Sequence, residues 1–99
     1  MKRRSVREIL DHREWAEVAA EVEYDAVALA MLCGVSLRTL ERAFQKELQI
    51  SPQEWLEKLR DAKAALLVNA GKRKKEIVYM LGYKYQSHLS RRLKQAQQL

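Results

Sequence analysis

The sequence predicts an all-α protein made of two helix-turn-helix units joined by a long helix. The chain has 99 residues with only three glycines and one proline, and no stretch alternates apolar with polar residues as a strand would. Its apolar residues recur three or four positions apart, which is the spacing of one helix face. Twice, a short apolar segment ends at a glycine and is followed by a basic amphipathic segment.

The first helix is expected at about residues 6–20. Ser5 is placed to cap it, and Val6, Ile9 and Leu10 lie on one face.

The first helix-turn-helix unit is predicted from the stretch "DAVALAMLCGVSLRTLERAFQKEL". Asp25 can cap a short helix that stops at Gly34, and Ser36 can cap a second helix. The apolar residues of that second helix are expected to face inward: Leu37, Leu40, Phe44 and Leu48. Its polar residues are then expected to form an outward stripe: Arg38, Glu41, Arg42 and Gln45.

The long connecting helix has the clearest start. The sequence "SPQE" is a capping box with Pro52 at the first helical position. The helix is expected over residues 52–69, where apolar residues continue at helical spacing: Trp55, Leu56, Leu59, Ala62, Leu66 and Leu67. At 1.5 Å per residue it would be about 27 Å long.

The second unit repeats the order of the first. Ile77, Val78 and Leu81 mark a short helix that ends at Gly82, and Leu89 and Leu93 mark the buried face of the next helix. The chain is therefore expected to be a single domain over residues 1–99. Within it we expect a first subdomain at about residues 5–51, the connecting helix at 52–69, and a second subdomain at 70–99.

Net charge and composition restrict the classes of function that the chain can have. A net charge of +6 favours a polyanionic partner, either nucleic acid or an anionic membrane surface. No apolar run approaches about eighteen residues and no signal peptide is visible, so a cytoplasmic, nucleoid-associated protein without a membrane span is expected. One cysteine, Cys33, and two histidines provide no metal-ligand spacing, so neither a metal nor a cofactor is expected. Cys33 and Trp55 are expected in the core.

The outward residues of the two second helices suit the edges of DNA bases. Such a helix lies in the major groove, where arginine pairs with guanine and glutamine with adenine. The candidate base readers are Arg38, Thr39, Glu41 and Arg42 in the first unit and Gln86, Ser87, His88 and Arg91 in the second. The candidate phosphate contacts are Lys46, Lys72, Arg73, Lys74, Lys75, Lys84, Arg92 and Lys94. Taken singly, exposed arginines more often form a solvated face, and "GKRKKE" more often forms a soluble turn.

Two longer patterns carry a family resemblance. They are "LAMLCGVSLRTLERAFQKELQISPQEWLEKLRDAKAALL" and "EIVYMLGYKYQSHLSRRLK", and together they span most of the chain. With them the chain resembles the DNA-binding domain of AraC/XylS-type transcriptional regulators. The resemblance implies recognition helices at Leu37–Leu48 and Tyr85–Lys94 that enter successive major-groove turns on one face of the DNA. The chain departs from the family pattern at Lys74, Leu89 and Leu93, which predicts a less stable second unit.

The sequence therefore favours a sequence-specific, double-stranded DNA-binding transcriptional regulator. We expect a bacterial activator that binds as a monomer, with RNA polymerase as a further candidate partner. The alternative is a protein-interaction module, in which the acidic residues Glu14, Glu17, Glu21 and Glu23 dock on polymerase or a partner regulator. RNA binding ranks third because the aromatic stacking surface of single-strand readers is missing. An enzyme is not expected, because no nucleophile-base set or carboxylate pair can be assembled.

Overall fold

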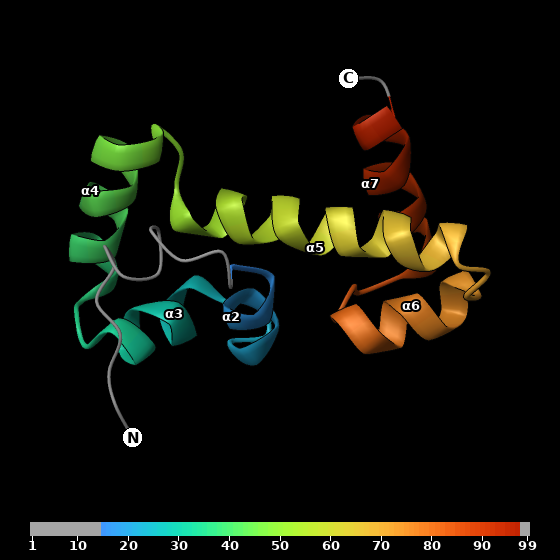
Figure 1. Ribbon diagram of the computed structural model, residues 1–99, viewed down its shortest axis with the longest axis horizontal. Coiled ribbons are helices and arrows are strands. Elements are labelled where there is room, and N and C mark those ends of the chain that lie inside the picture. Colours follow the sequence, from blue (N-terminus) through green and yellow to red (C-terminus); the bar gives the residue numbers. More distant parts are fainter. Residues whose placement is uncertain (1–14, 98–99) are drawn as a thin grey trace. The chain divides into compact units, whose positions relative to one another are not determined.

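The computed structural model describes residues 15–97, and every regular element in that range is helical (Figure 1). The elements are α2 (Trp15–Glu21), α3 (Ala26–Cys33), α4 (Leu37–Leu48), α5 (Pro52–Asn69), α6 (Lys74–Leu81) and α7 (Gln86–Gln97). The all-α prediction is confirmed. Most of the helix expected at residues 6–20, with its cap at Ser5, lies outside the described residues, and the part within them continues to Glu21 as α2.

The chain forms two compact units that divide within α5. The first unit runs up to Glu57 and the second begins at Lys58. The sequence-based boundaries treated residues 52–69 as a separate connector. In the structure α5 instead gives buried side chains to both units, including Leu56 in the first and Ala64 in the second, each fully buried.

Short polar contacts set the helix ends of the first unit as the sequence predicts. The Asp25 carboxylate accepts a hydrogen bond of 3.0 Å from the backbone N–H of Val27, at the start of α3. Gly34 ends α3 with φ of 72°, a left-handed conformation that glycine adopts without a steric penalty. The Ser36 hydroxyl then accepts from the N–H of Thr39 at 3.1 Å and caps α4.

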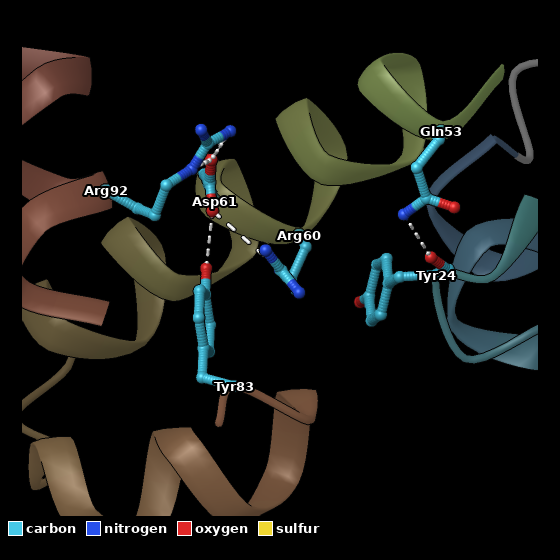
Figure 2. A network of polar contacts seen from close by, with 6 residues as sticks. All are labelled: Tyr24, Gln53, Arg60, Asp61, Tyr83 and Arg92. Carbon is cyan, nitrogen blue, oxygen red and sulfur yellow. Dashed lines mark hydrogen bonds and ion pairs between the residues drawn. The ribbon is translucent and has the colours of Figure 1, made fainter. Parts of the chain in front are cut away.

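The start of α5 is also as predicted. α5 begins at Pro52, and the Ser51 hydroxyl accepts a hydrogen bond of 3.1 Å from the N–H of Glu54. At the second residue of the same helix, the Gln53 amide binds the turn between α2 and α3. It accepts from the N–H of Ala26 at 3.1 Å and donates to the carbonyl of Tyr24 at 3.2 Å (Figure 2).

The core of the first unit is apolar. α3 packs against α4, and the ring of Phe44 meets that of Trp55 edge to face, with centroids 5.2 Å apart. Trp55 and Cys33 are buried, as predicted. The inward face of α4 is narrower than predicted, because only Leu40 and Phe44 are buried on it. The prediction for Leu37 and Leu48 is wrong: each is 37% exposed, since they are the first and last residues of the helix.

The second unit has fewer apolar side chains to bury. α6 packs against α7, and Gly82 ends α6 in the left-handed conformation with φ of 75°. The buried apolar residues in this unit are Ala64, Ile77, Leu81, Tyr83 and Leu89. In α5, Ala62 and Leu66 do not continue the buried face as predicted, and both are exposed. The buried positions next to them belong to Arg60 and Asp61, whose polar groups are considered below.

Candidate nucleic-acid interface

The outer face of α4 carries the predicted base readers of the first unit. Its four candidates and Lys46 are all exposed, and Leu40 and Phe44 are buried on the other side of the helix. Because these two apolar residues anchor α4, the rotation of the helix about its axis is determined and the polar stripe must point to solvent.

Arg38 and Arg42 lie one helical turn apart on this face. Neither guanidinium forms an ion pair with any residue in the described part of the chain. Thr39 also has a structural role at the start of α4, because its hydroxyl oxygen accepts a hydrogen bond of 3.0 Å from the hydroxyl of the capping residue Ser36. Two unpaired guanidinium forks on a rigid, capped helix form a surface suited to an external anion or to base acceptors.

The start of α7 carries the candidates of the second unit. Gln86, Ser87 and Arg91 are exposed, whereas His88 is half-buried. The His88 ring packs edge to face on Tyr83, with ring centroids 5.4 Å apart. His88 therefore helps to pack α7 against Tyr83, and only the exposed edge of its ring is available to a ligand.

Most of the candidate phosphate contacts are exposed lysines and arginines. Exposed cations occupy the turn before α6, the first two residues of α6, the turn before α7 and the outer sides of α4 and α7: Lys46, Lys72, Arg73, Lys74, Lys75, Lys84 and Lys94. Lys74 also donates from Nζ to the Ser90 hydroxyl at 3.2 Å, a contact between the start of α6 and the middle of α7. Arg92 is different, because it is only half-exposed and its guanidinium is bound within the protein.

A buried carboxylate organises the second unit. Asp61 of α5 accepts a hydrogen bond of 2.6 Å from the Tyr83 hydroxyl on one oxygen (Figure 2). Its other oxygen accepts from Nε and Nη2 of Arg92 at 2.8 and 2.7 Å. The carboxylate thus links α5 to the turn before α7 and to the middle of α7 itself.

Arg60 completes this cluster from the other side. Its guanidinium carbon lies 4.2 Å from the centroid of the Tyr83 ring, a cation–π contact. Its Nε is 3.9 Å from the Asp61 carboxylate, too far for a hydrogen bond, and has no hydrogen-bond partner among residues 15–97. Burial, together with the hydrogen bond to Asp61, raises the pKa of Tyr83 well above its usual value, so the phenol stays protonated and donates.

Sequence reasoning missed this cluster. The apolar spacing gave no signal for it, because at about 100° per residue Asp61 stands on the opposite side of the helix from Leu59. The usual assumption that charged residues point outward hid it.

Other kinds of site find no support in the described residues. Between residues 15 and 97 no cluster of His, Cys, Asp and Glu is placed to bind a metal ion. No helix in that range is long and apolar enough to cross a membrane. Burial raises the pKa of the Cys33 thiol, which leaves it protonated and unreactive at neutral pH.

Comparison with known proteins agrees with this geometry. A family model described as a helix-turn-helix domain matches residues 29–98, a range that includes α4 to α7. The chain belongs to the AraC-type helix-turn-helix family. As a member of this family, it is a DNA-binding transcription regulator. No curated protein and no solved structure matches the chain.

Proposed function

We propose that this AraC-type protein is a sequence-specific activator that inserts α4 and α7 into successive major-groove turns of double-stranded DNA. The observation that carries the proposal is the outward face of α4. There, Arg38 and Arg42 lie one turn apart on a capped helix whose opposite face is buried. Arginine forks at that spacing suit guanine O6 and N7 in neighbouring base pairs.

In the first unit, the two arginines act as the main readers. Glu41 lies on the same exposed face and either accepts from cytosine N4 or orients an arginine. Thr39 is close to the helix start, where it meets a thymine methyl group or a phosphate.

In the second unit, Gln86 is the main reader, since it stands at the first position of α7 and its amide suits adenine. Ser87 and the free edge of His88 assist it. Arg91 lies further along the helix and reaches a guanine or a flanking phosphate. The exposed lysines and arginines of both units bind phosphates, with Lys72, Arg73, Lys74 and Lys75 clustered before and at the start of α6.

A single chain would contact both halves of a bipartite site. It carries both candidate reader helices, α4 in the first unit and α7 in the second. We expect a monomer to protect a non-palindromic site whose halves are about one DNA turn, roughly 34 Å, apart. A footprint that is symmetric and requires a dimer would contradict this. Such a protein would act in the cytoplasm at the nucleoid and contact RNA polymerase to activate transcription.

DNA binding is tested by titrating a labelled mixed-sequence duplex with the protein at several salt concentrations. Binding to this duplex through several phosphate contacts should weaken steeply as salt increases, and a single strand or an RNA duplex of the same length should compete poorly. Arg42→Gln is the informative variant and Glu47→Gln, on the same helix, is its matched control. Equal binding to all of these nucleic acids, or none, would contradict the proposal.

A second candidate function rests on exposed apolar side chains. Met31 in α3 is 73% exposed and Tyr79 in α6 is 91% exposed, and each stands three residues before the glycine that ends its helix. Tyr79 is followed by Met80, which is 55% exposed, and exposed apolar side chains grouped in this way favour a protein contact. The alternative is therefore docking on RNA polymerase or a partner regulator, with weak DNA binding. If Met31→Ser and Tyr79→Ser bind DNA as the wild type does but no longer capture polymerase, the two activities are separate.

A further inference from the structure

The residue that precedes α7 differs in kind from those that precede α3, α4 and α5. Each of these three helices begins after a residue whose side-chain oxygen accepts a hydrogen bond from a helix N–H: Asp25, Ser36 and Ser51. α7 begins after Tyr85, whose carbonyl accepts from the N–H groups of His88 and Leu89 at 3.1 and 3.2 Å. Tyr85 therefore occupies the capping position of α7.

Tyrosine is a poor residue for this position. Its hydroxyl lies at the far end of a rigid ring, so it cannot turn back to the N–H groups of its own helix as a serine oxygen does. The Tyr85 side chain is 68% exposed, and between residues 15 and 97 it has no hydrogen bond, ring contact or cation–π contact. Within this part of the chain, a serine at residue 85 would hold the start of α7 better than the tyrosine does.

The same side chain stands where the proposed readers of the second unit begin. Gln86 follows Tyr85 as the first residue of α7, and the exposed Lys84 precedes it. A recognition helix meets base edges with the residues at its N-terminal end. The turn before α7 is fixed, because Tyr83 is buried and its hydroxyl donates to Asp61 at 2.6 Å. An exposed ring on a fixed turn loses little freedom when it meets a ligand.

We propose that the ring of Tyr85 contacts the C5-methyl group of a thymine beside the base that Gln86 reads. The proposal rests on the proposed DNA-binding function and adds a base reader to it. Lys84 and the net charge of +6 favour a polyanion as the ligand of this surface. The thymine methyl is the apolar group that the major groove offers, and apolar side chains contact it there.

Tyr85→Ser is the deciding variant, because a structural role and a DNA contact predict opposite results for it. Serine supplies a capping oxygen, so the melting temperature measured by circular dichroism should rise by about 4–8 °C, the effect of an ordinary cap in a domain of this size. The preferred duplex, obtained by selection from a random library, should nevertheless bind about fourfold more weakly, because one methyl contact is lost.

Two further variants separate the ring from other causes. Tyr85→Phe keeps the ring and removes the hydroxyl, so it should bind the preferred duplex as the wild type does. Tyr79→Ser removes a tyrosine of α6 that is 91% exposed, and it is the control for the loss of an exposed aromatic side chain from the second unit. Its affinity for the preferred duplex should not change.

The DNA side of the contact is tested by replacing the thymines of the preferred duplex with uracil, one at a time. Uracil lacks only the methyl group and still pairs with adenine. At one position the wild type should lose about fourfold in affinity. Tyr85→Ser should lose nothing further at that position, although it should keep the sensitivity of any thymine that Thr39 contacts.

Unchanged affinity in Tyr85→Ser would overturn the inference, and so would a lower melting temperature, because Tyr85 would then support the fold. An equal loss in Tyr85→Phe would assign the contact to the hydroxyl, and an equal loss in Tyr79→Ser would remove its specificity; either result overturns the inference. So does a wild type that is insensitive to uracil at every position. A wild type that binds no duplex, or a selection that enriches no sequence, would contradict the proposed function itself.

Discussion

In the first unit α4 is held by apolar packing, with Phe44 against Trp55 and a fully buried Leu40. In the second unit α7 also buries Leu89 completely, but a buried carboxylate, Asp61, binds the same helix through Arg92. Apolar packing is insensitive to charge and contributes stability roughly in proportion to the area buried. A buried ion pair has a desolvation cost that its own attraction offsets only when the geometry is good. Comparison of the two units teaches that the same helix order can be stabilised by different physical means, with different responses to mutation, salt and pH.

The largest difference between the units should appear on removing the aromatic contact. Phe44→Ala deletes a side chain that is 1% exposed, and should destabilise the first unit by about 3–5 kcal/mol. Hydrogen exchange should show lost protection in α3 and α4, with α6 and α7 much less affected. Uniform loss of protection in both units would mean that they do not unfold separately, and the comparison would fail.

A smaller difference is expected in DNA recognition. Arg42→Ala should cost about 1–3 kcal/mol on the preferred site, whereas Gln86→Ala should cost less than about 1.5 kcal/mol. The physical reason is that the second unit buries fewer apolar side chains, so we expect α7 to lose more freedom when it docks. Titration of both variants at one fixed salt concentration measures this. A larger loss for Gln86→Ala would show that the second unit dominates recognition.

The sequence predicted most of the fold, because its signals were local. Capping residues such as Asp25 and Ser36, and the proline that opens α5, set helix starts through contacts within a few residues. The burial of Leu37 and Leu48 was predicted wrongly because spacing defines a face but not how far the partner surface extends along it.

The exposure of the candidate base readers could be predicted from the sequence, because they lie opposite the apolar faces of their helices. Their contact with DNA remains a prediction. The Asp61 cluster could not be predicted, because it joins residues 22 and 31 positions apart in the chain. Periodicity carries no information about which distant polar group will meet a buried carboxylate. The half-burial of His88 was missed for another reason: its ring packs on Tyr83 in the turn before α7, where helical spacing does not apply.

A third prediction concerns the polar support of the second unit. Tyr83→Phe removes the hydroxyl that donates to Asp61 at 2.6 Å, and should reduce the free energy of unfolding by about 1–3 kcal/mol near neutral pH. Denaturant unfolding measures the change. Tyr79→Phe is the matched control, since that side chain is 91% exposed and should have almost no effect.

The raised pKa of the same hydroxyl predicts that the protein loses stability at alkaline pH. The pKa of Tyr83 is raised in the folded protein, so the native state holds this proton more tightly than the unfolded state, where the value is about 10. Its contribution is fully present below about pH 10 and is lost as the pH increases further, by at most about 1.4 kcal/mol per pH unit. Tyr83→Phe should flatten the stability profile above pH about 10. If the stability of Tyr83→Phe falls as steeply above this pH as that of the wild type, the alkaline loss does not come from Tyr83.

The smallest expected effect belongs to a single exposed cation. Lys75→Ala should weaken binding to all sequences alike and reduce the salt slope by about one, without changing base preference. Titration against the preferred and a random duplex at three salt concentrations measures this. A selective loss on the preferred site would move Lys75 from the phosphate contacts to the base readers.

Selection of bound sequences from a random duplex library examines DNA binding and the contrast between the units in one experiment. We expect enrichment of a non-palindromic site with two parts, in which the positions that lose preference in Arg42→Ala are sharper than those that lose it in Gln86→Ala. Absence of any enriched sequence, or sharper preferences at the Gln86 positions, would contradict it.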